Sequence, residues 1–340
     1  MGGAGQFTEP AAGARAEQPG PRYDLRPLST GEVLDRTFQL YRSHFLLFVG
    51  LALLPAAVST VANAVRLVII GAAGLHPGAH PGPAFARAQI LSSVLSMVGG
   101  LISIVLYGIT QAATTWAVSR IYLGDAASVK AAYRVGFQHW FRYTLVKLRQ
   151  IWAAMWLPLV LILAAVLVPA WAKRRGGGLL WLEVVLIVLA VLSLIYAVWA
   201  YLRVSLAVPA AVVESLKTGA AVRRSKQLLA SRKVRVFLLL LLLWALYLVV
   251  GTLESPLLIL AVRSRGTEAF VMRAIQLGIN FAAATLIGPV GVIGLCLFYF
   301  DERVRREGFD IEWMMGKLAP AEAAATDLPG PATEPPAEPA

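Results

Sequence analysis

Six long runs of apolar residues, separated by shorter polar segments, dominate the pattern of this chain. A helix needs about 20 mostly apolar residues to cross a bilayer, and each run is long enough to do so. We therefore expect an all-α, polytopic membrane protein with six transmembrane helices. The expected spans lie near residues 45–70, 90–118, 151–172, 179–202, 236–262 and 270–300.

The fourth run is the hardest to bound, because apolar residues continue from Leu179 to Val213. That length exceeds one simple crossing, and Arg203 and Pro209 interrupt it. Proline lacks the N–H that an interior helical turn requires, so a helix bends or stops near it. We expect the span to end just before Arg203, and residues 204–213 to form a bent continuation.

A polar, amphipathic segment precedes each pair of spans: residues 30–43, 128–141 and 218–231. The first and third segments share six of fourteen residues when they are aligned without gaps. The middle segment keeps only the initial hydroxyl residue and one arginine. This pattern predicts three pseudo-repeated units, each an amphipathic interfacial helix followed by a helical hairpin.

The first amphipathic segment has a recognisable helix start. Ser29 stands three residues before Glu32, the spacing of a capping box in which each side chain bonds the other residue's backbone N–H. An apolar stripe then follows at helical spacing, made of Leu34, Phe38, Tyr41 and Phe45. We expect this helix to lie in the headgroup layer, with Arg36 and Arg42 toward anionic lipid.

Composition also favours lipid as the solvent. The 340 residues are 58% hydrophobic and 15% charged, whereas a soluble domain is about 45–50% apolar and about 25% charged. Residues 1–25 and 318–340 are rich in Ala, Gly, Pro and Glu, so we expect disordered tails around a membrane domain at 26–317. Cys296 is the only cysteine, which excludes a disulfide framework within the chain.

The net charge is +12, and the distribution of the basic residues along the chain predicts how the protein is oriented across the membrane. Most of the 31 Lys and Arg residues fall in the N-terminal tail, in residues 119–150 and 203–235, and after Phe300. The positive-inside rule then predicts a multi-pass protein of the inner (cytoplasmic) membrane with both termini cytoplasmic. The basic triplet at 173–175 opposes this orientation. We expect anionic lipid headgroups as partners and no nucleic acid.

Four charged residues stand inside the expected spans: Glu183, close enough to the start of its span to reach the interface, and the more deeply placed Glu254, Arg66 and Arg273. A charge at the centre of a membrane helix costs about 2.5–3.5 kcal/mol on insertion scales, so each needs a reason. One hypothesis is a structural ion pair of Glu254 with Arg273 or Arg66. The other is a path for a substrate or a proton.

Two motifs carry a resemblance to a known family. The first contains Pro209, Glu214 and the run Arg223-Arg224-Ser225, and the second is "FDERVRREGFD", residues 300–310. Together with "LRPLSTGEVLDRTFQLYRSHF" at 25–45, they resemble the bacterial glycerophosphoryl diester phosphodiesterase membrane domains and their stand-alone relatives. Lys226 departs from the family pattern, where an aromatic residue often follows the serine. The likeness covers roughly residues 25–315.

That resemblance implies a membrane part without chemistry of its own. In the family's enzymatic members a separate soluble barrel, fused after the membrane part, hydrolyses glycerophosphodiesters, and by resemblance this chain has the membrane part and lacks that barrel. The family motifs and charges near the membrane surface give a set of candidate cytoplasmic interface or docking residues. They are Arg36, Glu214, Arg223, Arg224, Asp301, Arg303, Arg305 and Glu307.

The end of the last span predicts a charged collar. Asp301 stands four residues before Arg305, and Glu302 four before Arg306, the order that favours helical ion pairs. We expect this helix to continue into water beyond Phe300.

No pattern in the chain indicates catalysis, a cofactor or a metal. His76 and His80 are four residues apart, but prolines and glycines place them in a loop. There is no phosphate-binding loop, nucleophile elbow or zinc-protease motif. We predict a non-enzymatic membrane scaffold or accessory protein, linked to lipid or glycerophosphodiester metabolism and able to bind a protein partner. The alternative is a small-solute or lipid transporter.

Overall fold

The computed structural model describes residues 26–72, 83–174, 180–230, 233–264 and 267–308. The two tails, the His76–His80 loop, Asp310 and Arg175 lie outside this described part.

Helices account for nearly all of the described residues, and no strand is present among them, which confirms the all-α class. The helices are α1 (Thr30–Ser43), α2 (Phe45–Ala72), α3 (Pro83–Tyr122), α4 (Val129–Gln138), α5 (Trp140–Arg174), α6 (Leu180–Val204), α7 (Ala207–Val213), α8 (Thr218–Leu228), α9 (Lys233–Arg263) and α10 (Thr267–Glu307).

Six of these helical segments are long and apolar enough to cross a membrane, as the sequence predicted. The helices are longer than the expected spans, and α5 begins at Trp140 rather than near 151. A helix does not end where hydropathy falls, because its backbone hydrogen bonds continue wherever one face finds packing partners. In the added turns of α5, Tyr143 and Val146 are buried. The fourth apolar run stops at Val204 and resumes as α7.

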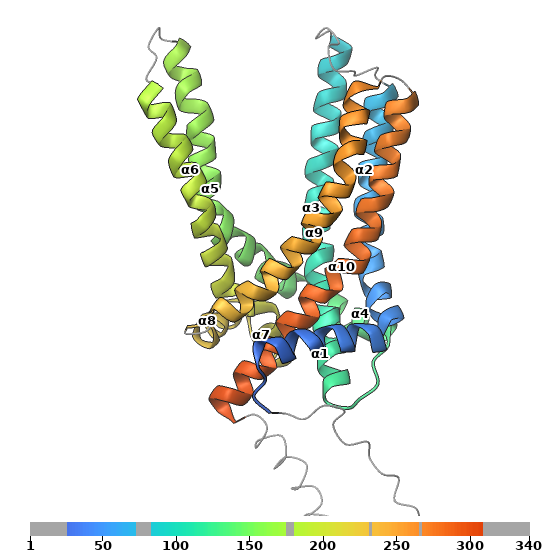
Figure 1. The fold of residues 1–340 in the computed structure, drawn as a ribbon, viewed down its shortest axis with the longest axis vertical. Coiled ribbons are helices and arrows are strands. Elements are labelled where there is room, and N and C mark those ends of the chain that lie inside the picture. The colour runs from blue at the N-terminus through green and yellow to red at the C-terminus, as the bar shows by residue number, and fades with distance from the viewer. Residues whose placement is uncertain (1–25, 73–82, 175–179, 231–232, 265–266, 309–340) are drawn as a thin grey trace, which may run out of the picture.

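The long helices form two arms that diverge from a common end of the molecule (Figure 1). The broad arm consists of α2, α3, α9 and α10, which pack on one another. The narrow arm is the α5–α6 hairpin, whose two helices pack chiefly against each other. The arms meet where α3 approaches α5 so closely that a Cβ on Gly108 would lie 3.2 Å from the backbone of Thr144.

The common end, which we call the base, contains α1, α4, α7, α8 and residues 290–307 of α10 (Figure 1). Most of the buried core of the protein lies in the base, where α10 is buried almost continuously from Val290 to Glu302. The first part of α10, in the broad arm, alternates between exposed and half-buried positions. Burial therefore concentrates at one end of the protein.

The order of elements repeats three times as amphipathic helix plus hairpin: α1 with α2–α3, α4 with α5–α6, and α8 with α9–α10. The contacts between helices show a regularity that the order of elements along the chain does not predict. Each amphipathic helix packs on the hairpin of the preceding unit, α4 on α3 and α8 on α5 and α6, and α1 closes the ring against α10.

Helix α1 has the predicted capping box, since Ser29 Oγ accepts the N–H of Glu32 and Glu32 accepts that of Ser29. Its most buried face differs from the expected apolar stripe. Val33, Thr37 and Leu40 are buried, whereas Phe38 is 38% exposed. Val33 and Leu40 belong to the same core cluster as residues of α10, which packs on α1, whereas Phe38 lies at the surface.

Helix α4 is joined to the α2–α3 hairpin by close approach and by hydrogen bonds of Tyr133, whose hydroxyl also lies 3.4 Å from Thr110 Oγ1 of α3. A Cβ on Gly136 would lie 2.9 Å from the carbonyl oxygen of Ile109 in α3, so only glycine fits there without a shift. In α2, Pro55 cannot donate to the carbonyl of Leu51. The hydroxyl of Tyr133 in α4 donates to that carbonyl at 2.6 Å, so the proline leaves no unsatisfied acceptor.

Candidate functional site

The base contains a buried ion cluster centred on Asp301 of α10. Its carboxylate accepts from Arg235 Nη1 at 2.6 Å, from Arg305 Nε at 3.1 Å and from the backbone N–H of Leu28 at 2.7 Å. Arg235 and Arg305 also both donate to the carbonyl of Leu28. The Asp301 side chain is fully buried, so these contacts are little screened by solvent. They tie the segment before α1 to α9 and α10.

A second cluster surrounds Glu214, the residue that ends α7. Arg224 Nε of α8 donates to both Glu214 oxygens, at 2.9 and 3.1 Å, and the hydroxyl of Tyr299 donates to one of them. Arg224 also contacts Glu307, which pairs with Arg303 at 3.2 Å. Burial alone lowers the pKa of the Arg224 guanidinium, but its hydrogen bonds with Glu214 and Glu307 outweigh this and raise the pKa. This cluster fastens α7 and α8 to α10.

The side chain of Ser225 satisfies two backbone groups at the break between α6 and α7. Its hydroxyl accepts the N–H of Leu206 at 3.1 Å and donates to the carbonyl of Arg203 at 3.0 Å. Both backbone groups lie at the end of a helix, where intrahelical partners are missing. The Arg224-Ser225 pair thus holds the junction of α6, α7 and α8 through its two neighbouring side chains.

The candidate docking residues are therefore mostly brought together inside the base. Asp301 and Arg305 belong to the first cluster, and Glu214, Arg224, Arg303 and Glu307 to the second. Arg36 donates to the hydroxyl of Tyr122 at 3.3 Å. Arg223 lies exposed on α8. The proposed docking role of this set stays a prediction.

The predicted collar forms, but its surroundings differ from the expectation. Asp301 pairs with Arg305, and Glu302 with Arg306 at 3.3 Å, as the spacing predicted. The expectation that the helix enters water directly after Phe300 is wrong, because Asp301 and Glu302 are only 3% and 1% exposed. Leu28 and Arg235 lie against them, and no helical pattern within α10 predicts such distant neighbours.

The charged residues of the spans do not pair as one hypothesis proposed. Glu254 Oε2 accepts from Asn280 Nδ2 at 3.1 Å, and among the described residues Glu254 has no arginine partner. Asn280 lies about two helical turns beyond Arg273 on α10, so the packing of α9 against α10 places an amide, not a guanidinium, beside the carboxylate. Arg66 is exposed on α2. A substrate or proton path through Glu254 stays a prediction.

A cavity of about 230 Å³ lies at the vertex where the two arms meet. Six helices contribute to this vertex cavity: α2, α3, α5, α6, α9 and α10. Its wall is apolar along α9 and α10, with Leu240, Leu243 and Ile287. Polar groups come from α3, α5, α6 and α9. They are Tyr107, Thr110, Gln111, Thr114, Lys147, Tyr201 and Tyr247.

Among the residues that the structure describes, Lys147 is the only charged one that lines the vertex cavity. Its ammonium donates to Gln111 Oε1 at 3.2 Å. Within the described residues, no carboxylate lies within ion-pair distance of Lys147. Gln111 is buried, and its amide NH₂ has no partner in the same part of the chain. The cavity therefore presents a cation and unused N–H donors, which suit an anionic or strongly accepting group.

Sequence reasoning missed Lys147 and Arg235 as site residues because it placed both in polar links between spans. A signal for Lys147 existed: Tyr143, Val146 and Gln150 recur at helical spacing around it, which indicates a helix with a packed face. No comparable signal existed for Arg235, whose partners lie 66 and more residues away.

Among the residues that the structure describes, no three His, Cys, Asp or Glu side chains gather as a metal site would require. The chain matches no protein-family model, no curated protein and no solved structure.

Proposed function

We propose that this protein is a non-catalytic accessory protein of the cytoplasmic membrane that holds a lipid between its two arms. The observation that carries the proposal is the divergence of the two arms (Figure 1), with the vertex cavity where they meet and buried charge clusters in the base. The resemblance to glycerophosphodiesterase membrane domains agrees with a task in lipid metabolism. Positive-inside charge supports placing the base on the cytoplasmic side.

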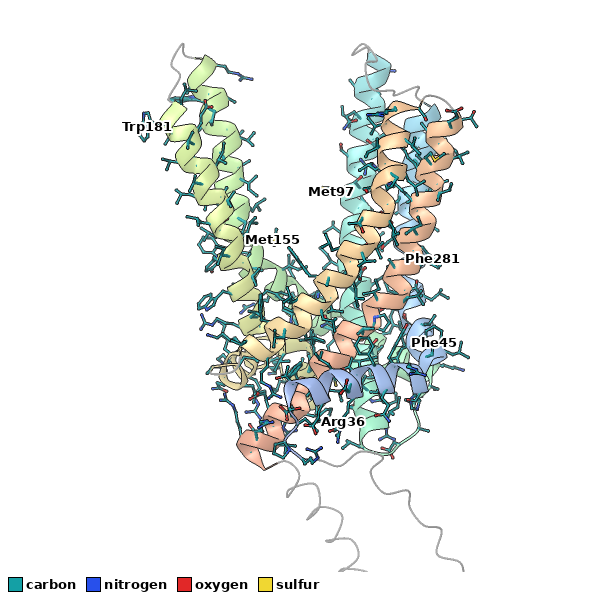
Figure 2. All side chains as sticks on the ribbon, viewed as in Figure 1. Arg36, Phe45, Met97, Met155, Trp181 and Phe281 are labelled. Atoms are coloured by element: carbon teal, nitrogen blue, oxygen red, sulfur yellow. The ribbon has the colours of Figure 1, made fainter. Side chains whose placement is uncertain are left out.

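The facing sides of the arms support lipid as the occupant. Met97 of α3 and Met155 of α5 lie on the sides of the arms that face each other (Figure 2). They are 64% and 49% exposed. Apolar surface of this kind is stable only against another apolar phase, which in a membrane is the acyl chains. The space between the arms is therefore suited to lipid tails.

The experiment asks whether lipid is retained between the arms. The protein is purified in mild detergent, and native mass spectrometry counts the phospholipids that stay with each chain. Met97→Trp combined with Met155→Trp fills the space between the arms, so we expect fewer retained lipids than in the parent protein.

Phe281→Trp is the matched control, because Phe281 lies on the side of α10 that faces away from the narrow arm (Figure 2). It adds the same side chain without occupying the space between the arms, and we expect lipid retention to be unchanged. Equal retention in the double variant and the parent, with both folded by circular dichroism, would overturn the proposal.

Two related functions remain as proposals. A transporter would also use the space between the arms, but the two charge clusters close the base, which supports holding a lipid over passing a solute through. A scaffold that docks a protein is favoured by the exposed basic side chains of α4 and α8, Lys130, Arg134, Arg223 and Lys226. Crosslinking that recovers one stoichiometric protein through these helices would favour the scaffold.

A further inference from the structure

We infer that the vertex cavity binds the headgroup of an anionic phospholipid, with Lys147 contacting its phosphate and Gln111 donating a second hydrogen bond. This inference rests on the proposed function and specifies the class of lipid. It follows from three features of the cavity: its depth, its unused donors and its walls.

Lys147 and Gln111 both lie well inside their helices, away from the helix ends. Lys147 is seven residues from the start of α5, about 10 Å along the helix axis. Gln111 is eleven residues from the end of α3, about 16 Å along its axis. A lysine near a helix end normally extends its ammonium toward the headgroup layer. Lys147 instead points at Gln111 and into the vertex cavity.

The hydrogen bonds at this point leave donors unused. An ammonium has three N–H donors, and the structure gives Lys147 one acceptor, Gln111 Oε1. The Gln111 amide keeps both of its N–H donors. A neutral ligand with as many donors as acceptors would not match this excess of N–H donors. A phosphate has several oxygens that accept hydrogen bonds from both the ammonium and the amide.

The cavity is also large enough for a headgroup and has both polar and apolar lining residues. Its volume of about 230 Å³ is far above the ~10–15 Å³ of such space that one water requires. The apolar residues Leu243, Ile287 and Val292 line the same cavity, next to the polar group. A molecule with a phosphate at one end and acyl chains at the other meets both walls, with its chains between the arms. A free phosphate ion would meet only the polar wall.

The test measures headgroup preference. The full chain is reconstituted in vesicles of equal phosphatidylglycerol and phosphatidylcholine, and the lipids that stay bound after extraction are counted by native mass spectrometry. We expect the parent protein to enrich phosphatidylglycerol about fivefold, the size of one lysine's attraction to an anionic membrane. Lys147→Met should remove this enrichment while lipid is still retained, and Lys147→Arg should restore most of it.

Lys217→Met is the matched control, because Lys217 is an exposed lysine at the start of α8, away from the cavity wall. Its enrichment should equal that of the parent protein. The inference is overturned if Lys147→Met keeps the preference, if Lys217→Met loses as much of it, or if millimolar inorganic phosphate displaces the bound lipid.

The same experiment separates the two proposals. Retention of lipid by the parent protein without any headgroup preference refutes the inferred selectivity for an anionic headgroup and leaves the lipid-holding function intact. Failure of the parent protein to retain any lipid refutes both. A variant that does not fold is replaced by Gln111→Leu, which removes the second donor and should lower the enrichment in the same direction.

Discussion

The base and the arms of this protein are built from several of the same helices, yet they bury different chemistry. Helix α10 passes through both. In the broad arm, Phe270, Val271 and Ile275 are 41–45% exposed, whereas in the base Phe298 and Phe300 are each 1% exposed. The base also buries carboxylates and guanidiniums, whereas the arms present mostly apolar side chains to their surroundings. The same helix therefore exposes apolar side chains at one end and forms part of a protein core at the other.

This difference shows where the specificity of the fold lies. Lipid tails are as apolar as leucine, so exposed apolar arms gain little by packing on each other and have no strong preferred partner. Charged groups out of water tolerate only a few arrangements, because each loses stability unless its hydrogen bonds are satisfied. The base therefore determines how the units join, and the arms remain free to accept the lipid that we propose.

The sharpest way to break the comparison is to remove Asp301 from the base. Asp301→Ala leaves Arg235, Arg305 and the Leu28 N–H without their shared acceptor. Loss of one partner of a buried ion pair costs about 3–5 kcal/mol, so we expect the largest loss of stability here. The measurement is denaturant or thermal unfolding in detergent.

The control is Asp125→Ala, in which an aspartate is removed from an ion pair with Arg120 whose two side chains are each 49% exposed. Exposed pairs contribute about 0–1 kcal/mol. Equal losses of stability in the two variants would show that a buried ion cluster of the base contributes no more than an exposed ion pair.

A pair of leucine truncations compares packing in the two regions directly. Leu206 at the α6–α7 break is fully buried, and Leu163 of α5 is 53% exposed. Leu206→Ala should cost about 2–5 kcal/mol because it leaves a cavity, whereas Leu163→Ala should stay within about 0.5 kcal/mol. Unfolding of both variants in the same detergent gives the difference. A larger loss for Leu163→Ala would place the stabilising core in the arms.

The smallest expected effect concerns the start of α1 and depends on pH. The N–H of Ser29 and the guanidinium of Arg26 lower the pKa of Glu32 from 4.5 to about 2. A carboxyl with a depressed pKa in the folded state contributes its full stability above its unfolded pKa and loses it as the pH falls through the folded value. The contribution of Glu32 should therefore be present above about pH 4.5 and vanish toward about pH 2.

We expect the melting temperature of the parent protein to exceed that of Glu32→Gln at neutral pH, and the difference to shrink between pH 4.5 and pH 2. Asp35→Asn, on the exposed face of the same helix, is the control and should show a smaller change over this range. A difference independent of pH would mean that the glutamate charge has no part in the cap.

Much of the local structure was readable from the chain, because local structure depends on near neighbours. The six spans follow from runs of apolar residues, and the cap of α1 follows from Ser29 and Glu32. The pairs of Asp301 with Arg305 and of Glu302 with Arg306 follow from helical spacing. Each of these signals operates within a few residues, where helix geometry alone brings the groups together.

What only the tertiary structure decided is which distant groups meet. The sequence did not show that α1 buries Val33 and Leu40, that Glu254 meets Asn280, or that Lys147 meets Gln111. Nor did it show that each amphipathic helix packs on the preceding unit. The physical reason is that a membrane helix is apolar on every side. Its hydropathy therefore shows that the helix can cross a membrane, but carries little information about which face packs against another helix.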